Sequence, residues 1–271
     1  NDGNVITNYG DEGINIQGSG VTGHVIQGNI IGLDPDGSTT ANAGDVGIAI
    51  ISGTGNTIGG TTTAARNIIS NNVEGIEINS DDNVVQGNFI GTDISGALDR
   101  GNHASDGVEI QSGAANNLIG GTAEGAGNLI AYNFQRGIQV TNGNGNELVG
   151  NTITGNRLSG IISTATATNI VGNVVYANST GATQAEIITG AGDQVYHNTV
   201  HGSQSDGISV AGSGAVFHNN IITGSAGYGI RLNGGSVTAE SNNLITDAVT
   251  GPANLSGRAN FALDASDLNA D

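Results

Sequence analysis

The sequence predicts an all-β protein: a single-stranded, right-handed parallel β-helix of about ten turns, with three short strands in each turn. Three observations carry this prediction: a recurring Asn-x-Ile/Val motif, a Gly-Ile-x-Ile motif that follows it, and a third apolar segment before the next asparagine. Apolar and polar residues alternate within these segments, which indicates strands rather than helices. A unit of about 22 residues cannot bury an apolar face alone, so the copies must stack on one another.

The Asn-x-Ile/Val motif marks the first strand of each turn. Most of its copies are 21 to 25 residues apart. The side-chain amide of one asparagine can hydrogen-bond to the asparagine of the next turn, so we expect a structural ladder rather than a binding site. Its members are Asn4, Asn29, Asn67, Asn88, Asn128, Asn151, Asn173, Asn198, Asn220 and Asn243.

The Gly-Ile-x-Ile motif marks the second strand, usually 9 residues after the asparagine. Copies begin at Gly13, Gly47, Gly75, Gly107, Gly137, Gly160, Gly207 and Gly229, and a degenerate copy lies near 185–188. The third residue of each copy should face outward. Stacking then gives one outward column: Asn15, Ala49, Glu77, Glu109, Gln139, Ile162, Ser209 and Arg231.

The third strand of each turn is a short apolar segment, such as Val25-Ile26 or Leu148-Val149. Each turn therefore has three strands and three corners, and glycine at a corner supplies the positive φ that other residues resist. Ten turns spaced ~4.8 Å apart give a rod of roughly 50 Å. A leucine-rich-repeat solenoid is the competing architecture, but its leucine spacing is absent and no segment has a helical pattern.

The predicted domain is one β-helix over residues 1–246, with an elaborated half and a plain half. The elaborated half is a long-loop super-repeat over 28–140, with copies at 28–79 and 87–140 and long loops at 32–45 and 91–106. Plain turns follow over 146–246. Residues 247–271 lose the pattern and are expected to form an irregular cap or the start of a further element.

The composition restricts the partners. There are 24 acidic residues against 6 basic ones, and the net charge is -18. This charge disfavours nucleic acid and anionic membranes as partners. No run of ~18 apolar residues is present to span a membrane. The absence of cysteine excludes disulfides and cysteine-ligated metals. We expect a secreted, extracellular or cell-surface protein.

Several motifs carry a family resemblance. The segment from Gly87 to Gly96 (G-N-x-I-G-T-D-x-x-G), the N-x-I-G-G-T segments and the G-I-x-I copies resemble right-handed parallel β-helix repeat proteins of the pectate-lyase-like superfamily. They look closest to β-helix segments of large secreted bacterial surface proteins. The resemblance covers residues 1–246 and implies the fold. It does not select among the lyases, epimerases, polygalacturonases, tailspikes and adhesins that share this fold. The order and spacing of the catalytic motifs of those enzymes are absent, so no catalytic residue is carried over.

Glu77 and Glu109 are the central candidate site residues, because the column places them on adjacent turns, ~4.8 Å apart. We expect loops 32–45 and 91–106 to wall a groove around them. The candidate ligand-binding residues are Glu77, Glu109, Gln139, Arg100 and Arg136, and Glu77 with Glu109 are the only candidates for catalysis. The candidate Ca²⁺ ligands are Asp34, Asp36, Asp93, Asp99 and Asp106, since calcium favours oxygen-rich sites. The alternative interpretation is a solvated acidic face.

A second candidate position is the pair His197 and His218, which we expect to stack on neighbouring turns. The structural alternative to a metal site is two stacked polar corners. Aromatic residues make up only 3% of the chain and tryptophan is absent, which disfavours a dedicated sugar-stacking cleft.

Two functions remain open from the sequence. The first is a structural or adhesive module of a secreted or cell-surface bacterial protein or extracellular fibre, with Ca²⁺ or a glycan as candidate ligand. Its partners would be cell-surface or matrix polysaccharide and, end to end, further copies of itself. The second is an enzyme, a polysaccharide lyase or epimerase that acts on a uronic-acid polymer. Because the sequence offers few candidate catalytic residues, it favours the structural or adhesive function.

Overall fold

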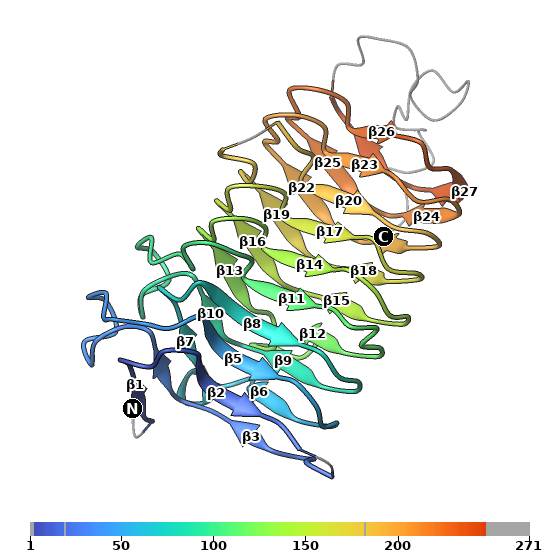
Figure 1. Ribbon diagram of the computed structural model, residues 1–271. Helices are drawn as coiled ribbons and strands as arrows, with labels where there is room; N and C mark the ends of the chain where they lie inside the picture. Colours follow the sequence, from blue (N-terminus) through green and yellow to red (C-terminus); the bar gives the residue numbers. More distant parts are fainter. Residues whose placement is uncertain (1–2, 19, 182, 248–271) are drawn as a thin grey trace.

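The computed structural model describes residues 3–18, 20–181 and 183–247 and has the predicted fold, a right-handed parallel β-solenoid of about ten turns (Figure 1). Three parallel sheets run along its axis. Strands that are neighbours within a sheet lie one full turn apart in the chain, so each sheet takes every third strand. The predictions of three strands per turn and of an all-β class are confirmed.

The first sheet follows the asparagine motif. It contains β1 (Val5–Ile6), β4 (Ile30–Ile31), β7 (Ile68–Ile69), β10 (Phe89–Ile90), β13 (Leu129–Ala131), β16 (Thr152–Thr154), β19 (Val174–Tyr176), β22 (Thr199–His201), β25 (Ile221–Thr223) and β28 (Leu244–Ile245).

The second sheet follows the glycine motif. It contains β2 (Glu12–Ile16), β5 (Val46–Ile50), β8 (Glu74–Ile78), β11 (Val108–Ile110), β14 (Ile138–Val140), β17 (Ile161–Ser163), β20 (Ile187–Thr189), β23 (Ile208–Val210) and β26 (Ile230–Leu232).

The third sheet holds the remaining strands: β3 (Val25–Ile26), β6 (Thr57–Gly59), β9 (Val84–Gln86), β12 (Leu118–Gly120), β15 (Glu147–Val149), β18 (Asn169–Val171), β21 (Gln194–Tyr196), β24 (Ala215–His218) and β27 (Val237–Ser241). A short 3₁₀ turn, η1 (Thr63–Ala65), lies between β6 and β7. Among the described residues, no helix is long and apolar enough to cross a membrane.

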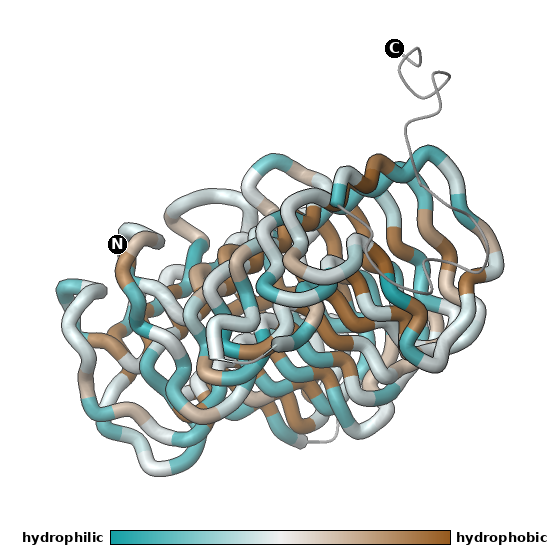
Figure 2. The backbone as a smooth tube through the Cα atoms, turned by 90° about the horizontal axis from the view of Figure 1, so that it is seen from above, coloured by the Kyte–Doolittle hydropathy of each residue, from teal (hydrophilic) through white to brown (hydrophobic). Residues whose placement is uncertain are grey.

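The core consists of columns of apolar side chains. Ile90, Ile130 and Ile153 occupy matched positions on successive strands of the first sheet and are fully buried. Figure 2 shows hydrophobic positions recurring from turn to turn along the solenoid. Burial of such surface contributes about 25 cal/mol per Å², so stacking stabilises turns that could not fold alone.

The register of the second sheet confirms the outward column. Glu77 is paired with Ala49 on one side and Glu109 on the other, and Glu109 is paired with Gln139. In the degenerate turn, Ile188 fills the column between Ile162 and Ser209.

The predicted stacking of His197 on His218 is wrong by one residue. In the third sheet His218 is paired with Tyr196, and the two rings stack with centroids 5.4 Å apart. His197 instead lies at the corner after β21 with a φ of 57°. Equivalent residues of these two turns are 22 residues apart, as Asn198 and Asn220 are, whereas His218 follows His197 by 21.

Three asparagine ladders hold the corners together in the part of the chain that the structure describes. In the predicted ladder, the backbone N–H and the side-chain amide of each asparagine donate to Oδ1 of the asparagine in the next turn; for Asn128 and Asn151 these distances are 3.1 and 2.9 Å. The second ladder lies at the corner before the strands of the third sheet and comprises Asn56, Asn83, Asn117 and Asn146. The third ladder lies at the corner before the strands of the second sheet and comprises Asn72, Asn102, Asn133, Asn156 and Asn178.

The two long loops form matching hairpins. An antiparallel bridge joins Leu33 to Thr40 in the first loop and Thr92 to Asp99 in the second. The tips also contact one another, because the backbone N–H of Ile94 donates to the carbonyl oxygen of Gly37 at 2.8 Å. Of the predicted cap 247–271, only Asp247 lies within the described residues.

Candidate functional site

Glu77 and Glu109 lie side by side on β8 and β11, as the column predicted. Oε1 of Glu77 accepts hydrogen bonds from Asn79 Nδ2 at 2.8 Å and Gln111 Nε2 at 2.6 Å. Glu109 accepts one from Gln139 Nε2 at 2.5 Å. Each of the two carboxylates therefore accepts from amide donors, and the predicted ligand-binding residue Gln139 belongs to this network.

Two further acids join this pair. Burial, together with the neighbouring carboxylates of Glu109, Glu77 and Asp106, raises the pKa of Glu74 to about 9. We therefore expect Glu74 to be protonated at neutral pH, beside the carboxylate of Glu109. The sequence motif missed Glu74 because this residue lies just before the glycine that begins the repeat.

Asp106 is the one predicted calcium ligand that lies beside the acidic pair. It is buried, and its Oδ1 accepts from the backbone N–H of Arg136 at 2.7 Å while Oδ2 lies 3.6 Å from the Arg136 guanidinium. Burial raises its pKa to about 6, against the opposing effect of Arg136. Arg136 thus contacts this cluster, which comprises Glu74, Glu77, Asp106, Glu109 and Gln139.

The other four predicted calcium ligands lie in the long loops, and the side chains of Asp36, Asp93 and Asp99 accept hydrogen bonds from within their own loops. Asp36 accepts from the Thr39 hydroxyl, and its Oδ1 accepts from the N–H groups of Thr39 and Ser38 at 2.8 Å. The bond from the hydroxyl and then those from the two N–H groups lower the pKa of Asp36 to about 2. Asp93 accepts in the same way from Ser95, Ala97 and Leu98, and Asp99 accepts from Gly101. The backbone N–H of Asp34 donates to Thr39. Across the described part of the chain, no group of three or more His, Asp or Glu side chains is arranged to hold a metal ion.

The loops cover a different face from the predicted one. Gly96 lies against the side chains of Phe89 and Leu129, and Ile94 lines a hollow with Ile68, so the loop tips lie over the first sheet. Arg100, predicted to bind a ligand with the glutamates, donates instead to the carbonyl oxygens of Ser38 and Asp99. The expectation that these loops wall the Glu77–Glu109 pair is therefore wrong for the loop tips: the pair lies on the second sheet, where Asp106, at the end of loop 91–106, lies beside it.

The second loop also lines an open hollow of about 480 Å³, which we call the corner hollow. It extends along four successive turns at the corner between the first and second sheets. Its polar and aromatic lining comprises Asp99, His103, Tyr132, Phe134, Arg157 and Thr180, with Asn102 and Asn133 of the third ladder beside them.

Tyr132 has an unusual backbone in this hollow. Its φ is 60°, a conformation that bulky residues rarely adopt. The equivalent corner of other turns holds Asn71, Gly155 or Gly202, which tolerate it. Gly155 makes room for the ring, since a Cβ there would lie 2.9 Å from it. Strained residues of this kind concentrate at functional sites.

Arg157 completes the hollow with a positive charge. Its guanidinium lies 4.5 Å from the centroid of the Phe134 ring. Within residues 3–18, 20–181 and 183–247, the ion pairs are Arg136–Asp106 and Arg231–Asp206, so no carboxylate neutralises Arg157. The sequence could have indicated this site through the Tyr-Asn-Phe segment at 132–134. The whole chain has nine Tyr and Phe residues, and two of them lie in this one corner.

Comparisons with known proteins agree with this fold. The family model described as "Right handed beta helix region" matches residues 187–267. The periplasmic alginate epimerase AlgG aligns in structure over 83% of this chain and 51% of its own, with 17% identity and a TM-score of 0.56. A single-residue mutant of AlgG aligns over 83% and 50%, with 16% identity and a TM-score of 0.52. No curated protein matches the chain in sequence.

At these identities the likeness establishes the fold alone. The chain has the right-handed parallel β-helix fold that the sequence motifs predicted, and it spans about half the length of AlgG. A shared fold does not transfer an activity.

Proposed function

We propose that the chain is a structural, adhesive β-solenoid of a secreted or cell-surface protein that binds an acidic polysaccharide in the corner hollow. The observation that carries the proposal is the strained Tyr132 beside Phe134 and the unneutralised Arg157. Aromatic rings can stack on the apolar faces of sugar rings, and a guanidinium pairs well with a uronate carboxylate. The hollow extends along four turns, which suits a polymer laid parallel to the axis.

The net charge of -18 opposes binding of an anionic polymer over most of the surface. Affinity must then come from a local cationic position. Arg157 supplies it, and its side chain is exposed. Binding should accordingly depend on Arg157 and strengthen with salt that screens the remaining acidic surface.

The second candidate is a lyase or epimerase that acts on a uronic-acid polymer. The hollow favours it, because His103, Tyr132 and Arg157 supply the types of group that such a reaction needs. Removal of the proton beside a uronate carboxylate requires a base, and a nearby cation stabilises the charge that develops. AlgG, a structural neighbour, is an alginate epimerase.

Calorimetric titration with oligomers of alginate and polygalacturonate tests the binding proposal. The wild-type protein should bind, and Arg157→Gln and Tyr132→Asn should each weaken binding about tenfold or more. Asparagine suits the positive φ at position 132, so the fold should persist. Arg66→Gln, which changes an arginine stacked on a different phenylalanine, is the matched control. Equal affinity for all four proteins would refute the corner hollow as the site.

Two readouts separate binding from catalysis. Growth of ultraviolet absorbance from unsaturated uronate ends would establish lyase action. Incorporation of solvent deuterium at C-5, followed by NMR, would establish epimerase action. Binding with neither signal leaves the adhesive function.

A further inference from the structure

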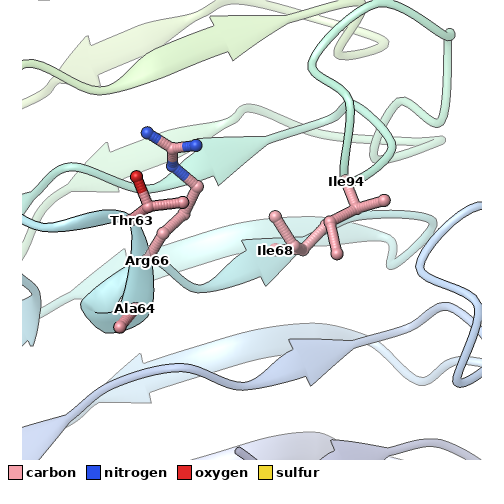
Figure 3. A pocket seen from close by; sticks show the side chains of 5 residues that line it. All are labelled: Thr63, Ala64, Arg66, Ile68 and Ile94. Atoms are coloured by element: carbon pink, nitrogen blue, oxygen red, sulfur yellow. The ribbon is translucent and has the colours of Figure 1, made fainter. Parts of the chain in front are cut away.

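A second hollow, separate from the proposed polysaccharide site, lies on the outer face of the first sheet. Its volume is about 360 Å³, and it is lined by Thr63, Ala64, Arg66, Ile68 and Ile94. Three segments build it: the η1 insertion, strand β7 and the tip of loop 91–106. In Figure 3 the apolar pair Ile68 and Ile94 lies on one side, and the polar pair Thr63 and Arg66 lies on the other.

The apolar side of this hollow continues a small outer core. Ile30, Leu33 and Ile68 are buried together there, and Phe89 packs against them. Ile94 projects from the loop tip and is 46% exposed, so a ligand could still cover part of it. Gly37 holds Ile94 in place, because the Gly37 carbonyl oxygen accepts a hydrogen bond from the Ile94 N–H. The two residues are in close contact: a Cβ on Gly37 would lie 2.8 Å from the Ile94 side chain.

The polar side holds a cation without an anion. The Arg66 guanidinium lies 3.9 Å from the centroid of the Phe89 ring, and its Nε donates to the carbonyl oxygen of Gly87 at 3.2 Å. Burial lowers its pKa. Among the residues that the structure describes, no carboxylate forms an ion pair with Arg66, although the chain carries 24 acidic residues. A partly dehydrated guanidinium with free N–H donors gains most from a bound anion.

We propose that this hollow binds an amphipathic carboxylate: a ligand with one carboxylate and a medium-length alkyl chain. The carboxylate pairs with the Arg66 guanidinium and accepts from the Thr63 hydroxyl. The alkyl chain lies along Ile94 and in contact with Ile68, where it removes the exposed apolar surface of Ile94 from water. A mostly apolar pocket with a few polar groups that fix orientation is the usual form of a small-ligand site, and the volume lies in the usual range.

Titration with octanoate, followed by calorimetry and by NMR of the isoleucine methyl groups, tests the proposal. Octanoate should bind the wild-type protein and shift the Ile68 and Ile94 methyl signals. Octanol, which lacks the charge, should bind about tenfold more weakly or not at all, since a charged hydrogen-bonded pair of this kind is worth about 1.4 kcal/mol or more. Galacturonate, which lacks the alkyl chain, should not shift these signals.

Three variants make the test specific. Arg66→Gln should weaken octanoate binding about tenfold, and Ile94→Ser, at the exposed loop tip, should weaken it several-fold. Arg157→Gln is the matched control, because it removes the other arginine stacked on a phenylalanine and should leave octanoate binding unchanged. If octanoate does not bind, or if Arg66→Gln and Arg157→Gln behave alike, the proposal is overturned. The polysaccharide titration uses a different ligand and residue, so either proposal can fail alone.

Discussion

The side-chain amide of Asn178 donates a hydrogen bond of 2.6 Å to Oε2 of Glu186, so the third asparagine ladder ends on a carboxylate. The backbone N–H of Asn178 also donates to this carboxylate, at 3.1 Å. Glu186 is fully buried. The corner positions that follow the second ladder are Thr168 and Asp193, and Asp193 accepts from the backbone N–H of Thr168 at 2.9 Å. At both corners a carboxylate therefore stands where the ladders have an asparagine acceptor, and the two positions become sensitive to pH.

This arrangement predicts that the protein is most stable at mildly acidic pH. Burial raises the pKa of Glu186 to about 7 and that of Asp193 to about 6, although hydrogen bonds from Asn178 and Thr168 oppose the shifts. A pKa that is higher in the folded protein than in the unfolded chain means that protonation favours folding. The free energy of unfolding should thus fall as pH rises from about 5 through about 7, which thermal unfolding between pH 5 and 8 measures.

The substitution Glu186→Gln isolates the contribution of Glu186 to the pH dependence of stability. Glutamine keeps an oxygen acceptor for Asn178 but cannot ionise, so the variant should lose less stability than the wild-type protein between pH 6 and 8. Glu124→Gln is the matched control, because Glu124 is exposed. An identical pH profile for the Glu186→Gln variant and the wild-type protein would contradict the prediction.

Substitution of a ladder asparagine should lower the free energy of unfolding. Asn133 Oδ1 accepts from Asn102 Nδ2 at 2.8 Å, and its own Nδ2 donates to Asn156 Oδ1 at 2.9 Å. Asn133→Ala removes the acceptor shared by the buried backbone N–H and side-chain amide of Asn102, at about 1–3 kcal/mol for each donor left unsatisfied. Asn156 Oδ1 keeps the backbone N–H of residue 133 as a donor. We expect urea unfolding to show a loss of about 3 kcal/mol, against less than about 0.5 kcal/mol for the exposed Asn142→Ala. Similar losses for the two variants would mean that the ladder does not stabilise the solenoid.

The corner glycines should be intolerant of alanine where two turns come close. A Cβ on Gly91, whose φ is 91°, would lie 2.0 Å from the carbonyl oxygen of Ala131. Gly113 has a similar φ of 82° but open space around it. Gly113→Ala therefore reports the backbone strain alone, about 1 kcal/mol, whereas Gly91→Ala adds a clash with backbone. In thermal unfolding, the Gly91→Ala variant should have a much lower Tm than the Gly113→Ala variant. The reverse order of the two Tm values would refute this account.

Glu74 should be protonated at neutral pH. Burial and three nearby carboxylates raise its pKa to about 9, so the folded state binds this proton more tightly than the unfolded chain does. Carbon-13 NMR of the glutamate side chains should show one carboxyl that stays protonated at pH 7, and Glu74→Gln should remove that signal. Stability should also fall in the wild-type protein as pH rises toward about 9, and less so in the variant. A spectrum in which every glutamate is ionised at pH 7 would show the prediction to be wrong.

The sequence by itself determined the period of the solenoid, because the alternation of isoleucine and valine with polar residues can bury a core only if the turns stack. It also determined the outward column, and hence the pairing of Glu77 with Glu109, since strand register follows from which residues must face the core. The second ladder was within reach as well: Asn56, Asn83 and Asn117 also stand two residues before Ile or Val, as the asparagines of the predicted ladder do.

Tertiary structure alone decided where the long loops lie and what they enclose. Their tips rest on the first sheet because of contacts between residues far apart in the chain, such as Ile94 with Gly37 and Arg100 with Ser38. No periodic pattern encodes such contacts. For the same reason the corner hollow, which collects Asp99, Tyr132 and Arg157 from three turns, becomes visible only once the turns are stacked.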